Sequence, residues 1–327
     1  MRILLQTGLC IAVFLTCTNW GFLAHRTIHQ LAVYELPQPL QQLFYRHLDS
    51  IVRNAVRPDL RRSEDRTEGP KHYINLELFG PDAVHRMPLL WEEATAVYSR
   101  DSLLKYGHVP YYIMMMKDKL TQAFRQGLAD SVLFYATDMA HYIADAHVPL
   151  HTTSNYDGQL TGQRGLHSVW ESLIPEMELA GYTLSSRHRA RYLQEPQKAI
   201  WDAVRHAHSL VPDLLEKERQ ASTGFTDATK FRVQVRNGRE SKIYTKEFAK
   251  AYSRLLGSTV NDQLIRSADL IADFWYTCWV DAGRPDVSKW VAPAWGKSDK
   301  VALKKELKAF RKNRLVSRKL LRSLEVD

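Results

Sequence analysis

Residues 141–151 read His-Tyr-Ile-Ala-Asp-Ala-His-Val-Pro-Leu-His, and residues 167–171 read His-Ser-Val-Trp-Glu. The two stretches contain five potential metal ligands, which are His141, Asp145, His151, His167 and Glu171. The pairs His141–Asp145 and His167–Glu171 are each spaced four residues apart, so each pair projects from one face of a helix. Imidazole and carboxylate groups bind zinc where thiolates are absent, and the pattern therefore predicts a metal site built on helices.

The sequence between the two pairs supports the same site. Pro149 is expected to end the first helix and to turn His151 back toward the other ligands. One His-x3-Asp pair is weak evidence, because many such pairs are ordinary contacts on a helix surface, whereas two pairs that bracket a third histidine form a strong signal. The alternative is a set of scattered histidines with separate hydrogen bonds. His147 points away from the ligand face by helical spacing, and we expect it to be structural.

Most of the chain is predicted to be helical. Apolar residues recur at three- and four-residue steps in Ile28–Leu36, Leu40–Val52, Trp91–Tyr98, Tyr111–Arg125, Ala129–Ala146, Gln197–Leu215 and Thr245–Val280. Thr152–Gly165 is rich in Gly, Asn, Asp and Thr and is predicted to be a loop. Phe231–Val235 and Lys242–Tyr244 flank Asn237-Gly238, which predicts a small hairpin. The expected fold class is all-α, a compact multi-helix domain.

The first 19 residues have the pattern of a secretory signal peptide. They begin with Met-Arg, continue with a largely apolar run that is too short to span a bilayer, and end with Cys-Thr-Asn. Cys10 and Cys17 lie in this segment, so the mature chain keeps only Cys278 and has no internal disulfide. We expect export to the periplasm or the cell exterior. A lipoprotein attached through Cys17 is the weaker alternative, because Thr16 is a poor residue before a lipidated cysteine.

The positive charge of the chain is concentrated near its C-terminus. The net charge is +9, and residues 297–327 contribute eleven Lys/Arg against four Asp/Glu. Once this segment and Arg2 are subtracted, residues 20–296 carry a net charge of only +1. We therefore divide the chain into a signal (1–19), a catalytic domain (20–290) and a basic tail (291–327). The tail is expected to contact an anionic membrane surface or nucleic acid, or else to be a solvated, partly disordered appendage.

Two further groups of residues are candidates for the metal site. Asp59 and His72 would alone be interpreted as a turn carboxylate and a surface histidine. Trp20 and His25 stand at the expected cleavage point. If cleavage falls before Trp20, its free amine and carbonyl can chelate a metal beside His25; otherwise these two residues simply open the first helix.

Taken together, the motifs resemble those of the superfamily of zinc-dependent phospholipases C and single-strand-specific zinc nucleases. The matching motifs run from Trp20 to Glu171 in the order Trp-Gly-x3-His, Asp-x2-Arg, His-Tyr-Ile, His-x3-Asp-x5-His and His-x3-Glu. The resemblance implies an all-helical enzyme with a buried centre of three zinc ions. The implied ligands are Asp59, His72, His141 and Asp145 for the first ion, His151, His167 and Glu171 for the second, and Trp20 and His25 for the third, with Asp145 bridging the third ion to the first.

The resemblance also implies hydrolysis of phosphate diesters, because clustered zinc ions neutralise charge on the phosphoryl group and activate water. Asp59 would act as a general base or orient the water, and Arg62 would contact phosphate. Tyr73 and Asn75 occupy positions where nuclease members stack on and hydrogen-bond a base.

The substrate implied by the sequence is either a phospholipid or a single-stranded nucleic acid. Glu171 in place of aspartate, the short loop between His151 and His167, and the absence of disulfides resemble the bacterial phospholipases. We therefore expect a phospholipase C-like enzyme, with a single-strand nuclease or 3′-nucleotidase as the alternative. A non-catalytic metal- or membrane-binding protein is a further alternative. No feature implies a stable protein partner.

Overall fold

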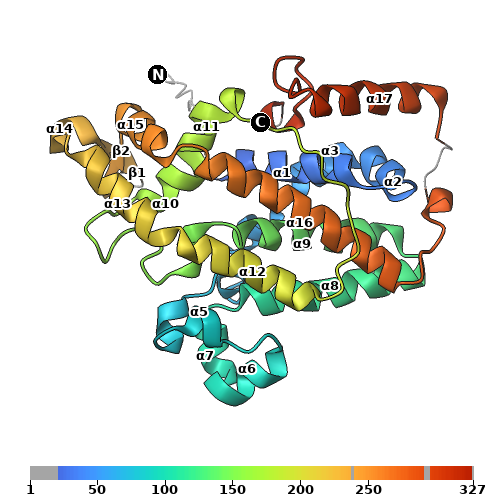
Figure 1. Ribbon diagram of the computed structural model, residues 1–327, viewed down its shortest axis with the longest axis horizontal. Helices are drawn as coiled ribbons and strands as arrows, with labels where there is room; N and C mark the ends of the chain where they lie inside the picture. Colours follow the sequence, from blue (N-terminus) through green and yellow to red (C-terminus); the bar gives the residue numbers. More distant parts are fainter. Residues whose placement is uncertain (1–20, 237–238, 291–294, 326–327) are drawn as a thin grey trace, which may run out of the picture.

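The helix α9 (Ala129–Asp145) carries the predicted ligand pair of residues 141 and 145 in its last turns. It packs against α8 (Val109–Gln126) and α16 (Thr259–Asp281), and α1 (Phe22–Glu35) lies against both α9 and α16. Figure 1 shows these helices side by side in the middle of the molecule. The computed structural model describes residues 21–236, 239–290 and 295–325.

The remaining elements surround this central group. The longer of the other helices are α2 (Leu40–Arg46), α3 (Leu48–Asn54), α4 (Arg57–Arg61), α6 (Trp91–Tyr98), α7 (Arg100–Tyr106), α11 (Ile174–Glu178), α12 (Pro196–Ser209), α13 (Val211–Ser222), α15 (Lys246–Leu256) and α17 (Lys297–Arg311). The shorter helical segments are η1 (Gly69–Lys71), η2 (Leu76–Phe79), α5 (Ala83–Arg86), η3 (Pro149–Thr152), α10 (Leu166–Ser168), the π-helical η4 (Val169–Leu173), η5 (Leu179–Gly181), α14 (Asp227–Lys230), η6 (Val287–Trp290) and η7 (Arg322–Leu324).

The all-α prediction is confirmed, and the central helices share one large hydrophobic core. Trp201 of α12 and Trp275 of α16 are fully buried in it, and Trp275 Nε1 donates a hydrogen bond to the backbone carbonyl of Ala136 at 2.9 Å. Burying such large side chains in close-packed contact fixes the helices relative to one another. The end of α9, with its predicted ligand pair, is held by this packing.

Several predicted helices are interrupted where the backbone cannot continue them. The predicted helix 197–215 divides at Leu210, because Pro212 lacks an amide N–H and sits in the first turn of α13. The predicted helix 245–280 divides at Gly257, whose φ of 63° is favourable only for glycine. The predicted helix 40–52 divides at His47 into α2 and α3. The segment between η3 and α10 is a loop, as predicted for Thr152–Gly165.

A predicted hairpin is also confirmed. Strands β1 (Phe231–Arg236) and β2 (Arg239–Tyr244) pair antiparallel, with Arg232 opposite Ile243 and Gln234 opposite Ser241. The predicted Asn237-Gly238 turn lies outside the described residues. Tyr244 anchors the hairpin in a second apolar cluster that also contains residues of α13, α15 and η4. The hairpin therefore packs on the helical segment that carries Glu171.

The C-terminal segment is part of the folded core. Leu303, Phe310, Leu315 and Leu321 are at most 5% exposed. Glu306 accepts hydrogen bonds from the hydroxyls of Tyr34 and Tyr45 at 2.6 and 2.7 Å and pairs with both terminal nitrogens of Arg322. The interpretation of the C-terminal segment as a solvated appendage is therefore wrong for residues 297–325, because one face of α17 is apolar and packs on the body while the other carries the lysines.

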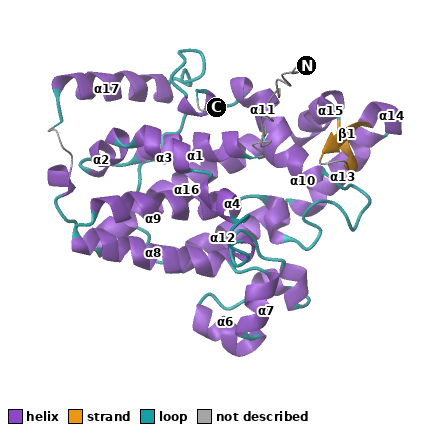
Figure 2. Ribbon diagram, turned by 180° about the vertical axis from the view of Figure 1, so that it is seen from behind, coloured by secondary structure: helices purple, strands orange, loops and turns teal. Residues whose placement is uncertain are grey.

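Figure 2, seen from behind, confirms that α17 and the hairpin lie at opposite ends of the molecule. Within the described residues, no helix combines the length and the apolar character needed to cross a membrane. The predicted signal peptide, its two cysteines and Trp20 lie outside those residues.

Replacement of Phe310 by alanine tests whether the C-terminal segment is integral to the core. Because the ring is buried, we expect Phe310→Ala to lower the free energy of unfolding by about 3–5 kcal/mol. Urea unfolding at a fixed zinc concentration measures this value. The control Lys304→Ala, on the exposed face of α17, should change it by less than about 0.5 kcal/mol. Equal values for the two variants would contradict the packing.

Candidate metal centre

The buried carboxylate of Asp145 lies at the centre of the candidate site. Its Oδ2 is 2.8 Å from His72 Nδ1 and 3.3 Å from His141 Nε2. Its Oδ1 is 3.4 Å from His25 Nε2 and 3.5 Å from His151 Nδ1. Each oxygen thus faces its own pair of imidazoles, which suits a carboxylate that contacts two cations at once.

Backbone carbonyls orient three of the imidazole rings. Nδ1 of His141 lies 2.8 Å from the Ala55 carbonyl, Nδ1 of His151 lies 3.0 Å from the His72 carbonyl, and Nδ1 of His167 lies 3.1 Å from the Tyr156 carbonyl. A carbonyl only accepts, so each Nδ1 carries the proton and each Nε2 offers a lone pair. Fixing one nitrogen in this way prepares the other to bind a metal.

A second group of ligands is formed by His151, His167 and Glu171. Glu171 Oε2 is 2.6 Å from His167 Nε2 and 3.7 Å from His151 Nε2. Glu171 Oε1 is 3.5 Å from His25 Nε2, so this carboxylate also reaches the group around Asp145. The π-helical turn at η4 alters the helical rotation in this segment.

The start of α1 is built against the same carboxylate. Gly21 has a φ of 76°, and a side chain there would meet Glu171 Oε1 at 3.2 Å. The Gly21 backbone N–H donates to Ser172 Oγ at 2.5 Å. The positive φ and the close approach favour glycine at this position, and the hydrogen bond keeps the start of α1 beside the segment that carries Glu171.

Asp59 completes the candidate ligand set. Its Oδ1 lies 3.7 Å from His72 Nδ1 and 3.8 Å from His141 Nε2, and burial raises the pKa of this carboxyl group. The ligand atoms form three groups, each within 4.8 Å: His25, His141 and Asp145; Asp59, His72 and His141; and His151, His167 and Glu171. The nitrogen and oxygen donors fit zinc, and eight of the nine ligands expected from the sequence converge. The ninth, Trp20, lies outside the described residues.

The electrostatics of the cluster favour bound cations. Burial lowers the pKa of His25, but hydrogen bonds with Asp145 and Glu171 outweigh burial and raise this pKa to about 10. Burial similarly lowers the pKa of His72, and Asp145 raises it to about 9. Burial acts to raise the pKa values of Asp145 and Glu171, but the surrounding histidines hold both well below their usual range. The ionised carboxylates thus attract protons onto the histidines, and metal ions would replace those protons.

An open cleft leads to the candidate ligands. It has a volume of about 580 Å³, and its walls include Asp59, Arg62, Phe22, Tyr156, Asp157 and the second ligand group. The side chain of Arg62 is 53% exposed, with Nη1 3.6 Å from Asp59 Oδ1. A phosphate ester entering this cleft would meet both a guanidinium group and the ligand cluster.

Glu68 was missed in the sequence analysis. This carboxylate is 1% exposed, lies 3.5 Å from His72 Nε2, and accepts a short hydrogen bond from the Tyr142 hydroxyl. Arg61 and Lys71 also pair with it, at 3.2 and 2.8 Å. It therefore holds the ring of His72 on the side away from Asp145. The four-residue spacing of Glu68 and His72 was the available signal.

Tyr73 and Asn75 are not among the residues that line the cleft. Tyr73 is half-buried, and burial raises the pKa of its hydroxyl. The charge of Arg62 lowers this pKa and Tyr156 raises it, so the ring lies near both side chains. A side chain at Gly107 would collide with that ring, at 2.5 Å from Cδ2. The Asn75 backbone N–H donates to the Tyr106 carbonyl at 2.9 Å. Tyr156 and Phe22, which do line the cleft, carried no motif by which the sequence could identify them.

Comparison with known proteins assigns a family to this arrangement. The family model described as S1/P1 Nuclease matches residues 20–274, which is most of the chain and includes every candidate ligand. A search of the curated proteins finds no match. The predicted superfamily is confirmed by the family match, and the chain belongs to the S1/P1 nuclease family as a zinc-dependent phosphodiesterase that hydrolyses phosphoester bonds.

Proposed function

We propose that this enzyme is an exported nuclease that cleaves single-stranded nucleic acid at a centre of three zinc ions. The proposal is carried by the family match together with a ligand cluster that opens into a cleft of about 580 Å³. The sequence favoured phospholipase C-like activity, whereas the family match supports the nuclease alternative more strongly. Export rests on the predicted signal peptide.

We assign the zinc ligands in three sets. Asp59, His72, His141 and Asp145 would hold the first ion; His151, His167 and Glu171 the second; and Trp20 and His25 the third, bridged by Asp145. The contact of 3.5 Å between His25 Nε2 and Glu171 Oε1 supports a further bridge through Glu171. Bound zinc would supply positive charge to phosphoryl oxygens and lower the pKa of a water molecule.

The side chains of the cleft have distinct proposed roles. Asp59, with a pKa raised by burial, is suited to orient the attacking water and take its proton. The exposed guanidinium of Arg62 can donate two parallel hydrogen bonds to phosphoryl oxygens. Tyr73 and Asn75 remain our candidates for contact with a base. Tyr156, which is 53% exposed on the cleft wall, is an additional candidate for stacking.

The second candidate function is a phospholipase C. Glu171 in place of aspartate and the short loop from His151 to His167 favour it. The lysines on the outer face of α17 provide a possible contact with an anionic surface, either a membrane or nucleic acid, outside the cleft.

A side-by-side assay distinguishes the two substrates. We expect the mature protein to cleave single-stranded DNA and to leave phosphatidylcholine vesicles intact. A chelator should abolish the cleavage, and added zinc should restore it, because the ligands act only through bound metal. Release of the phospholipid head group without cleavage of DNA would instead establish the phospholipase C alternative.

Substitution of Asp145 tests the bridge between zinc sites. An amide bridges two cations poorly, so Asp145→Asn should lose more than one zinc ion per chain and at least about 100-fold in kcat/KM. Elemental analysis gives the zinc content. The control is Asp138→Asn, on the same helix, where the carboxylate pairs with Arg57 and Arg61 at 2.6 and 2.7 Å. Asp138→Asn should keep all its zinc, and full zinc content in Asp145→Asn would disprove the bridge.

Extension of the chain by one residue before Trp20 tests the N-terminal ligand. The extension converts the amine into an amide, which is a poor ligand, so the third zinc ion should be lost and turnover should fall. The other two ions should remain, because their ligands lie on α4, directly after η1, on α9, and on the segment from η3 to η4. An extended protein with three zinc ions and full activity would refute this assignment.

A further inference from the structure

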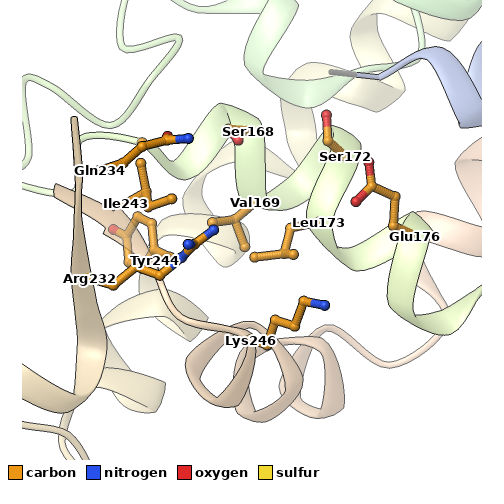
Figure 3. A pocket seen from close by; sticks show the side chains of 11 residues that line it. Ser168, Val169, Ser172, Leu173, Glu176, Arg232, Gln234, Ile243, Tyr244 and Lys246 are labelled. Atoms are coloured by element: carbon orange, nitrogen blue, oxygen red, sulfur yellow. The ribbon is translucent and has the colours of Figure 1, made fainter. Parts of the chain in front are cut away.

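A second cavity lies beside the helical segment that carries His167 and Glu171. It has a volume of about 280 Å³ and is enclosed by α10, η4, the hairpin and the start of α15. Figure 3 shows its side chains, with Ser172 and Glu176 on one side and Arg232, Gln234 and Ile243 on the other. The metal ligands are not among the residues that line it.

This cavity and the cleft at the candidate ligands lie on either side of a shared wall. Ser168 and Ser172 line both cavities. Each serine directly follows a candidate ligand, His167 or Glu171, so successive side chains of the same helical segment face first the cleft and then the cavity. The two spaces are therefore neighbours separated by these two serines, so a polymer whose scissile group lies in the cleft has to cross only this wall to reach the second cavity.

The lining combines cations with an apolar floor. Val169, Leu173 and Ile243 provide apolar surface, and the Gln234 amide lies at the edge. The guanidinium of Arg232 extends into the cavity in Figure 3. The side chain of Arg232 is exposed and makes no hydrogen bond or ion pair with the part of the chain that the structure describes.

Lys246, at the start of α15, adds a second cation to the cavity. Burial raises the pKa of Glu176, and the charge of Lys246 acts in the opposite direction. Among the described residues, no carboxylate lies within ion-pair distance of Lys246. The cavity thus contains two cations and one carboxylate. By contrast, Lys242 projects from the opposite face of the hairpin and pairs with Asp227 at 2.9 Å. On the hairpin, the cation that faces the cavity, Arg232, therefore lacks a close partner, whereas Lys242 on the other face has one.

We propose that this cavity is a subsite for single-stranded nucleic acid, holding a nucleotide outside the scissile phosphodiester. Arg232 and Lys246 bind its phosphate, and the apolar floor contacts its base. The subsite rests on the proposed nuclease function and adds to it a preference for longer strands. A dinucleotide fills only the cleft, whereas an oligonucleotide reaches both cavities.

The test compares substrates of two lengths. We would measure kcat/KM for a dinucleotide and for single-stranded DNA of ten nucleotides, using Arg232→Gln, Lys246→Gln and the double variant. For the oligonucleotide, the double variant should lose about tenfold, mainly through KM, and the slope of log(kcat/KM) against log[salt] should flatten by about 0.7 for each phosphate contact removed. For the dinucleotide, all three variants should stay within about twofold of the unmodified enzyme.

Two controls make the result specific. Lys242→Gln removes a cation from the other face of the hairpin and should leave both substrates unaffected. Arg232→Lys keeps the charge and should retain the salt dependence. Zinc content should be unchanged in every variant. An equal loss on both substrates, or no loss on the oligonucleotide, would overturn the subsite while leaving the nuclease proposal intact. Failure of the unmodified enzyme to cleave single-stranded DNA would overturn both.

Discussion

The structure of the site depends on one buried carboxylate, Asp145. It is 1% exposed at the end of α9, and its two oxygens face separate pairs of histidines. An isolated buried charge is too costly to maintain, so the surrounding groups must supply compensating positive charge. Protons on His25 and His72 supply it when metal is absent, as their raised pKa values indicate. Metal binding is therefore coupled to the protonation state and the stability of the whole cluster.

The position of His25 depends in turn on the far end of the chain. Helix α1 carries His25, and the hydroxyl of Thr27 in the same helix lies 2.8 Å from the Ser323 hydroxyl. Glu306 binds the hydroxyl of Tyr34, also on α1, as well as Arg322. The C-terminal segment thus closes over the helix that brings a ligand to the centre. Its lysines remain outside, so the same segment contributes both packing and surface charge.

Function in this enzyme is shared between a buried cluster and an open surface. Backbone carbonyls accept hydrogen bonds from the second nitrogens of His141 and His151, and Glu68 lies 3.5 Å from His72 Nε2, so these three rings are held in place. In the proposed function, selection among phosphate esters falls to the exposed groups around the cleft, where Arg62 and Tyr156 are accessible. Two enzymes with the same ligands can therefore differ in substrate, which is why the ligand motif alone left phospholipid and nucleic acid open. The family match favours nucleic acid.

The sequence by itself predicted the helical class and two pairs of candidate ligands, because four-residue spacing places His141 with Asp145 and His167 with Glu171 through local geometry alone. Pro212 and Gly257, which divide two of the predicted helices, are likewise local signals of a helix boundary. Only the tertiary structure decided the environment of those residues. The contact of Glu171 with His25, the support of His72 by Glu68, the burial of Phe310 and the second cavity beside Ser168 join segments from different elements. Such contacts depend on how the helices pack, which no local pattern of residues specifies.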